Sequence, residues 1–355
     1  MTDCPAHIID RDMSTSSARP KTKLWLDVDT GIDDSFALLY AAASPEAELI
    51  GVSCVAGNVP VEEVTVNTAA VLDLAGLNRV EVARGADRPI ERPLVTTPET
   101  HGPSGTGYSI LKAPPGRISE RDGVDLIVEK VRNHPGELTL VAVGPLTNIA
   151  LALDQEPDLL EMLGRLVIMG GCFTVTGNTA PRAEWNIHVD PEAARKVMAA
   201  AGKGTRNLPL FVPLDVTEQV LLRPDHVARI AESAGRPLRS AQPLHADEGN
   251  PLLDFMADAL RFYMEFHFGY DGIYGAFMHD PFAVAAALDP TLVETVETTV
   301  DVETKGELTT AETVADLRNA WGRPPNAAIA LQGRTDLFLD RLVTRLGALA
   351  RADLL

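Results

Sequence analysis

Cysteine is scarce in this chain, with three residues in 355, at positions 4, 54 and 172. These cysteines are widely spaced and match neither the paired-cysteine pattern of a zinc site nor the disulfide framework of a small secreted protein. Chains without disulfides are typical of reducing compartments. The scarcity of cysteine therefore predicts a cytoplasmic protein.

Long apolar runs and an excess of positive charge are also missing. No run approaches the ~20 apolar residues that a membrane-spanning helix requires. Asp and Glu number 50 against 31 Lys and Arg, so the formal net charge at pH 7 is −19. An acidic surface repels the phosphates of nucleic acids, so we expect no nucleic acid among the partners. Because a long apolar run is missing, we expect no membrane either.

Residues 1–22 differ from the rest of the chain in composition. They are polar, rich in Ser, Thr, Asp and Arg, and they lack the apolar core of a signal peptide. This composition predicts a disordered extension. Residues 23–355 are long enough to bury a large core as one α/β domain, and neither a repeat nor a long linker divides them.

Short apolar runs alternate with stretches of helical periodicity along the chain. This alternation predicts an α/β fold with an open, mostly parallel sheet, right-handed crossovers and helices on both faces. Near the C-terminus, residues 292–302 and 308–313 predict a small antiparallel hairpin, with 326–331 as a further strand. The apolar runs that precede this hairpin are 24–26, 49–55, 80–83, 138–143, 166–169 and 208–212.

One long irregular segment, 85–116, interrupts the pattern. It contains a glycine-rich stretch, 101–107, that begins with His101. Loops of this length inside a compact domain are usually functional or mobile. We expect the segment to form a flap over a pocket, and we expect selectivity to come from this flap and from the helical region 263–274.

Four carboxylates follow the first predicted strand directly, at Asp27, Asp29, Asp33 and Asp34. They repel one another unless a positive charge lies among them, and the carboxyl ends of parallel strands are where ligands bind. Oxygen ligands favour a hard cation such as Ca²⁺ or Mg²⁺. In the alternative interpretation Asp33 and Asp34 only cap a helix, which leaves the other acids unexplained.

A phosphatase of the haloacid dehalogenase type is a second alternative, because its Asp-x-Asp motif also follows a first strand. That motif continues as Asp-x-Asp-x-Thr, whereas Thr30 follows Asp29 directly here. The later strand ends offer Asn and Glu instead of the lysine and further acidic motif that such a phosphatase needs. The fit is therefore poor.

Further polar residues follow the later predicted strands or precede a helix. Each alone has an ordinary explanation as a turn residue or a helix cap. Their recurrence at the edge of the sheet that carries the aspartates favours a common site. They are Asn58, Asn178, Glu184, Asn186, His279 and Asp280.

The segment Asp27-Val-Asp-Thr-Gly-Ile-Asp-Asp34 resembles the opening signature of the nucleoside hydrolases, the inosine-uridine-preferring nucleoside N-ribohydrolases. The resemblance covers about residues 23–345. Thr30 departs from the family, which more often has proline there, but the change removes no ligand. The other matching motifs are 56–58, 143–148, 169–171, 177–178, 183–186 and 279–280.

The resemblance implies a Ca²⁺-dependent enzyme that hydrolyses the N-glycosidic bond of ribonucleosides to ribose and free base. It implies one α/β domain per subunit of a homodimer or homotetramer. Carried over by position, Asp29, Asp34 and Asp280 would bind Ca²⁺ through carboxylates and Val143 through its backbone carbonyl. Asp27 would support these ligands as a neighbouring acid.

The chemistry of cleaving a ribosyl bond, through an oxocarbenium-like transition state, then suggests roles for the other residues. Asp33 would act as general base on a Ca²⁺-bound water, and His279 would donate a proton to the leaving base. A nucleoside- or ribose-binding protein without activity is the remaining alternative, but it would be expected to lack the base or a metal ligand. The residues expected to hold the ribose are Asn58, Asn178, Glu184 and Asn186, with Met169 packed near the sugar.

Overall fold

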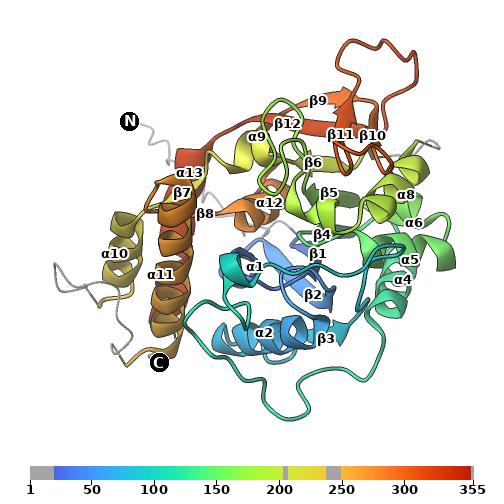
Figure 1. The fold of residues 1–355 in the computed structure, drawn as a ribbon. Coiled ribbons are helices and arrows are strands. Elements are labelled where there is room, and N and C mark those ends of the chain that lie inside the picture. Colours follow the sequence, from blue (N-terminus) through green and yellow to red (C-terminus); the bar gives the residue numbers. More distant parts are fainter. Residues whose placement is uncertain (1–19, 203–206, 237–248, 353–355) are drawn as a thin grey trace, which may run out of the picture.

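An eight-stranded sheet forms the centre of the computed structural model, which describes residues 20–202, 207–236 and 249–352 (Figure 1). The strand order is β3-β2-β1-β4-β5-β6-β12-β9, and all neighbours are parallel except β12 and β9. The strands are β1 (Thr22–Val28), β2 (Ala47–Cys54), β3 (Glu81–Arg84), β4 (Leu138–Ala142), β5 (Arg165–Met169), β6 (Leu210–Val212), β9 (Val293–Thr298) and β12 (Ala327–Gly333).

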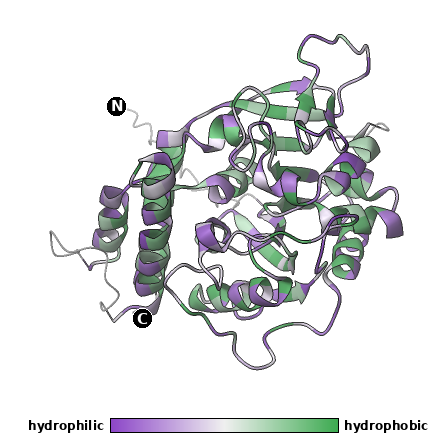
Figure 2. Ribbon diagram, viewed as in Figure 1, coloured by the Kyte–Doolittle hydropathy of each residue, from purple (hydrophilic) through white to green (hydrophobic). Residues whose placement is uncertain are grey.

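β1 shows why these segments form interior strands. Leu24, Leu26 and Val28 pack on one face of the sheet and Trp25 on the other, all of them without solvent exposure. A strand buried on both faces is largely apolar, as in parallel sheets covered by helices, and Asp27 is the buried polar exception on β1. The Trp25 indole N–H donates to Ser53 Oγ at 2.9 Å, which satisfies its polar atom. Figure 2 shows hydrophobic residues concentrated in the central strands.

Helices cover both faces of the sheet, so its two sides carry separate cores. One face holds α1 (Ile32–Ala42), α2 (Val61–Leu74), α12 (His279–Leu288) and α13 (Thr335–Ala352), and the other holds α4 (Gly123–Asn133), α5 (Thr147–Gln155) and α8 (Pro191–Ala201). α10 (Pro224–Ser233) packs on α13, and the long α11 (Pro251–Asp271) contacts α3 (Pro98–His101). The remaining short elements are α6 (Leu159–Met162), α7 (Trp185–Val189), α9 (Leu214–Thr217), β7 (Leu221–Leu222), β8 (Ala276–Phe277) and a 3-10 turn (Pro290–Leu292).

The predicted C-terminal hairpin differs in detail from the observed pairing. The run 292–302 divides at Thr299, whose hydroxyl donates to the backbone carbonyls of Arg323 and Pro324. β9, before this break, joins the edge of the main sheet, and β10 (Val300–Val302), after it, pairs antiparallel with β11 (Thr313–Ala315). The prediction of a strand over 308–313 was wrong except at Thr313, because Leu308 lies in a turn and is 88% exposed.

The fold class is therefore confirmed: an open, mostly parallel sheet with helices on both faces and a small antiparallel addition. The N-terminal extension was predicted over residues 1–22, of which 1–19 lie outside the described residues. Its last residue, Thr22, begins β1. No helix in the three described ranges combines the length and the apolar character needed to cross a membrane.

Candidate active site

The strand order changes direction between β1 and β4, which lie side by side in the sheet. From β1 the chain continues to β2 and β3 on one side, and from β4 to β5 and β6 on the other. The residues that follow β1 and β4, Asp29 and Val143, therefore stand together at the carboxyl edge. The helices that follow these two strands, α1 and α5, cover opposite faces of the sheet. In open α/β sheets such a reversal leaves the crevice in which ligands bind.

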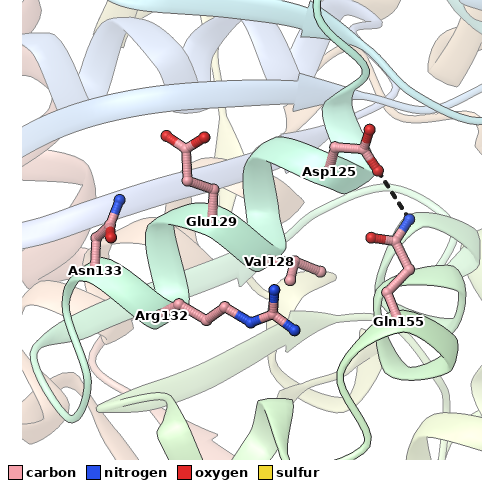
Figure 3. Close-up of a pocket in the computed structure, with 6 residues that line it drawn as sticks. All are labelled: Asp125, Val128, Glu129, Arg132, Asn133 and Gln155. Carbon is pink, nitrogen blue, oxygen red and sulfur yellow. Dashed lines mark hydrogen bonds between the residues drawn. The ribbon is translucent and has the colours of Figure 1, made fainter.

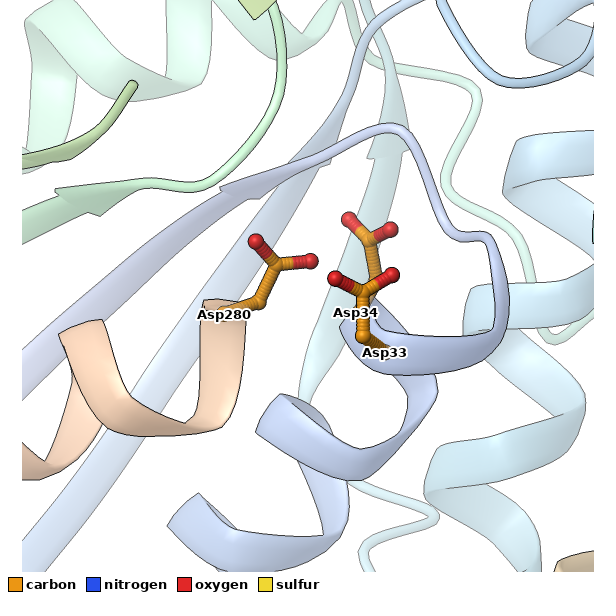
Figure 4. Close-up of side chains that lie close together, drawn as sticks. All are labelled: Asp33, Asp34 and Asp280. Atoms are coloured by element: carbon orange, nitrogen blue, oxygen red, sulfur yellow. The ribbon is translucent and has the colours of Figure 1, made fainter. Parts of the chain in front are cut away.

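Three aspartates bring their carboxylates together at this edge. Asp33 and Asp34 begin α1, and Asp280 lies in the first turn of α12. One oxygen of each lies within 4.8 Å of the others, and all three residues are buried (Figure 4). The turn before α1 requires glycine, because a Cβ on Gly31 would lie 2.7 Å from His101 Nδ1.

The carboxylates of Asp34 and Asp29 share a network of hydrogen bonds. Asp34 accepts from the backbone N–H groups of Asp29 (3.1 Å) and Gly31 (2.9 Å). Its Oδ2 also accepts from Asn58 Nδ2 at 3.2 Å, and Asp29 Oδ2 accepts from the Asn58 backbone N–H at 2.8 Å. Asp29 Oδ1 is buried without a partner among the described residues. Asp34 therefore does cap α1, whereas Asp29 keeps an oxygen free for another ligand.

These acids resist ionisation in the absence of a positive charge. Burial, followed by the negative charge of Asp34, raises the pKa of Asp29 and Asp33 well above the usual range. Burial and the charges of Asp33, Asp34 and Asp29 do the same to the pKa of Asp280. Burial also raises the pKa of Asp34 to about 6, although its hydrogen bonds oppose the shift. A hard divalent cation would remove this penalty, so the donor set fits Ca²⁺ or Mg²⁺.

Asp27 lies behind this cluster, on β1. Its Oδ1 accepts from Asn148 Nδ2 at 2.8 Å and from the Ser53 hydroxyl, while Oδ2 is buried without a partner in the described structure. Asn148 Nδ2 also donates to the Cys54 carbonyl at 3.0 Å. Asn148 thus connects β1, β2 and the start of α5. No role was predicted for Asn148 from the sequence, although it ends the motif 143–148.

A cavity of about 610 Å³ opens at the crevice. Asp33 lines it, whereas Asp29, Asp34 and Glu184 are absent from its wall. The structure thus brings most of the predicted site together in one cavity. The predicted residues in the wall are Asp33, Asn58, Val143, Met169, Asn178, Asn186, His279 and Asp280, together with His101 from the irregular segment.

Glu184 is held by backbone groups at the start of α7. Its carboxylate accepts from the N–H groups of Asn186 (2.8 Å), Gly171 (3.0 Å) and Ile187 (3.1 Å). Asn186 in turn donates from Nδ2 to the Val143 carbonyl at 2.7 Å. Glu184 thereby fixes the short helix that places Asn186 at the crevice.

Asn178 has a different setting from the other predicted sugar-binding residues. It is exposed, and its Oδ1 accepts from the Trp185 backbone N–H at 3.0 Å. This hydrogen bond closes the loop that leads into α7. Asn178 therefore stands at the mouth of the cavity.

The irregular segment 85–116 reaches the cavity only through residues 97 and 99–101. His101 Nδ1 accepts from the Ile32 backbone N–H at 3.1 Å, and its ring packs 5.4 Å from that of Tyr263. The segment thus forms part of the wall at the start of α1. That it closes over a ligand stays a prediction.

His279 is buried beside Asp280, with its Nδ1 2.8 Å from Thr217 Oγ1. Burial lowers the pKa of His279 to about 3, and the nearby His267 and His101 add to the lowering. The imidazole is therefore neutral near pH 7. A hydroxyl that donates to Nδ1 leaves the ring hydrogen on Nε2.

The region 263–274 was predicted only to contribute to selectivity. In the structure, α11 supplies a large part of the cavity wall. A signal was present in the i, i+4 spacing of His267 and Asp271, which places both on one face of a helix. The contributing residues are Tyr263, Phe266, His267, Tyr270 and Asp271.

A second pocket, of about 360 Å³, lies along α4 and near the end of α5 (Figure 3). Gln155 Nε2 donates to Asp125 Oδ1 at 2.9 Å, and Arg132 Nε donates to Glu156 at 2.8 Å. Three of its polar side chains, those of Asp125, Gln155 and Arg132, are thus already engaged in hydrogen bonds. We do not assign a site there.

Comparisons with known proteins show the family to which this chain is similar. The model of the family "Inosine-uridine preferring nucleoside hydrolase" matches residues 24–340. The chain is 37% identical to the inosine-uridine preferring nucleoside hydrolase of Crithidia fasciculata over 84% of this chain and 88% of that protein. It is 35% identical to the pyrimidine-specific ribonucleoside hydrolase RihA of Citrobacter koseri over 89% of this chain and 96% of that protein.

Solved structures give the same likeness. The purine-preferring ribonucleoside hydrolase from Gardnerella vaginalis superimposes with a TM-score of 0.83 at 31% identity, over 93% of this chain and 99% of that chain. The relatives differ in the bases named in their descriptions. The comparisons therefore do not select one base.

Proposed function

This chain belongs to the inosine-uridine preferring nucleoside hydrolase family and is a nucleoside N-ribohydrolase, and we propose on that premise that it depends on Ca²⁺ and uses Asp33 as general base. The observation that carries the proposal is the buried cluster of Asp33, Asp34 and Asp280 where the strand order reverses.

Asp29, Asp34 and Asp280 would hold Ca²⁺ through carboxylate oxygens, and Val143 through its backbone carbonyl. The unpartnered Oδ1 of Asp29 supports this set, because a buried carboxylate oxygen without a hydrogen bond is costly unless a ligand pairs with it. When bound, the ion would supply a positive charge that favours ionised carboxylates and a more acidic water.

The division of work between base and ligands rests on the cavity wall. Asp33 and Asp280 line the cavity, whereas Asp29 and Asp34 do not. The family resemblance gives Asp280 to the metal, which leaves Asp33 as the acid that faces the substrate. A general base must reach the water that attacks the sugar. We therefore assign proton acceptance to Asp33.

The ribose would lie against the part of the wall formed by the predicted sugar-binding residues. Glycosidic cleavage passes through an oxocarbenium-like transition state, so a fixed sugar and well-placed dipoles lower the barrier. Glu184 acts on the sugar site by fixing α7, and Met169 packs against Asn186, with its Sδ 3.5 Å from Asn186 Nδ2. The residues that would bind the hydroxyls are Asn58, Asn178 and Asn186.

His279 would donate a hydrogen bond or proton to the leaving base. Its place in the cavity wall next to Asp280 supports this role. His279→Ala should slow inosine hydrolysis far more than hydrolysis of p-nitrophenyl riboside, whose leaving group departs without an acid. Equal losses on both substrates would show that His279 acts only through Asp280 and the fold.

We also propose a homodimer or homotetramer in a reducing, cytoplasmic setting. Cys54 and Cys172, the cysteines in the described part of the chain, are buried and free, which agrees with this setting. Light scattering of the purified protein measures the assembly, and a monomer would contradict that part of the proposal.

The test of the function is a base-release assay with inosine, adenosine, uridine and cytidine. We expect release of free base and ribose from at least one of them. Tight binding of nucleosides without hydrolysis would overturn the proposal in favour of a binding protein without activity.

A further inference from the structure

The C-terminal part of α11 carries a histidine–aspartate pair on the cavity wall. His267 Nδ1 lies 2.7 Å from Asp271 Oδ2, one helical turn further on. Both residues line the cavity, and neither has been given a role above. His267 is only 7% exposed, and its Nε2 is buried without a hydrogen-bond partner among the described residues.

Aromatic rings hold the His267 imidazole in place. Its centroid lies 4.6 Å from the ring of Tyr263 and 4.8 Å from that of Phe277, which it meets at 90°. Phe266, at 5.1 Å, packs against it as well. With the Asp271 hydrogen bond, these contacts leave the imidazole little freedom.

The pair has the chemistry of an oriented acid. A carboxylate that accepts the Nδ1 hydrogen fixes the tautomer and leaves Nε2 to meet a ligand, and it stabilises the imidazolium form. Burial lowers the pKa of His267, but the hydrogen bond and charge of Asp271 oppose that lowering. Burial lowers the pKa of His101 and His279 to about 3 with no such opposition.

On the premise of the proposed nucleoside hydrolysis, we propose that His267, oriented by Asp271, is a second proton donor to the departing nucleobase, beside His279. As the C–N bond breaks, its electron pair goes to the base, which takes the Nε2 proton of the imidazolium. The water oxygen bonds to the sugar and its proton goes to Asp33. Ribose and the protonated base leave, and proton exchange with solvent restores both side chains.

Other titratable groups line the same cavity as His267. Asp271 and Tyr263 come from α11, His101 from α3, His279 from α12, and Glu218 from the residue after α9. Asp271 is the carboxylate that contacts the imidazole. Its removal should therefore disfavour the protonated form, and the alkaline limb of the pH–rate profile should move to lower pH.

The test compares His267→Gln and Asp271→Asn on inosine and on p-nitrophenyl riboside. His267→Gln should lower kcat on inosine by ~10² to 10⁴-fold, the scale for a lost general acid. The activated substrate should lose less than about tenfold, since its leaving group needs no proton. Asp271→Asn should show a smaller loss on inosine together with the shifted alkaline limb.

Phe268→Ala is the matched control, because Phe268 follows His267 on α11, is 62% exposed and is not in the cavity wall. It should leave both substrates near wild-type rates. Equal losses on both substrates for His267→Gln, or no loss, would overturn the donor role. An unshifted pH profile for Asp271→Asn would overturn the role of Asp271. Wild-type enzyme that cleaves neither substrate would instead overturn the proposed function.

Discussion

At the scale of single residues, Asp33 and Asp34 are neighbours with different surroundings. Asp34 accepts hydrogen bonds from two backbone N–H groups and the Asn58 amide. Asp33 faces the cavity. The sequence could place both acids after a strand, because that pattern is local. It could not tell which one faces the ligand, because that depends on α12 and β2, far away in the chain.

Asp33→Asn should lower turnover by ~10²-fold or more, the usual scale for a lost general base. Steady-state kinetics on inosine measures this, and competition by free ribose shows whether sugar binding survives. Asp336→Asn is the control, because Asp336 is also in the first turn of a helix but is exposed. Turnover of the Asp33 variant near the control value would contradict its assignment.

Glu218 gives a prediction for pH. Burial, with the charges of Asp271 and Asp215, raises its pKa from 4.5 to about 7. A carboxyl with a higher pKa in the folded than in the unfolded state makes the fold less stable as pH rises between those values. Glu218→Gln should therefore match the wild-type Tm at pH 4 and exceed it at pH 8. A Tm difference that does not grow with pH would contradict the raised pKa.

At the scale of elements, local patterns predicted most strands and helices of the main sheet. The division of 292–302 into β9 and β10 could not be predicted, because it depends on contacts of Thr299 with residues 323 and 324. The part of the cavity wall that α11 forms could likewise be indicated only as a region, because tertiary packing brings His267 to the cavity that Asp33 and Asp280 line. Glutamate is an unusual N-cap residue, so the hydrogen bonds from backbone N–H groups to the Glu184 carboxylate could not be predicted from the sequence.

The turn after β2 lies against Asp29, one of the proposed metal ligands. A Cβ on Gly57 would lie 2.1 Å from Asp29 Oδ2. Gly57→Ala should displace Asp29, cost about 1–3 kcal/mol as overpacking does, and weaken stabilisation by Ca²⁺. Gly269→Ala on α11 is the control, because no atom lies within 4 Å of its added Cβ. Equal melting behaviour of the two variants would count against the role of this turn.

At the scale of the whole molecule, we expect the buried acids to couple folding to cation binding. A ligand that binds only the native state stabilises it by about 2.7 kcal/mol at 100 times its Kd. Ca²⁺ should therefore raise the Tm of metal-stripped protein, and Asp29→Asn should lose most of that increase. Removal of the metal must be verified by elemental analysis, and a verified metal-free protein whose Tm ignores Ca²⁺ would disprove the site.

The central claim is that this acid cluster, with Ca²⁺ bound, carries out the hydrolysis. Its most direct test is the rate of base release from the best nucleoside substrate before chelation, after verified removal of metal, and after Ca²⁺ is restored. The account predicts that activity is lost with the metal and returns with Ca²⁺ in the wild type, while Asp33→Asn stays slow throughout. Full activity in the metal-free enzyme would contradict it.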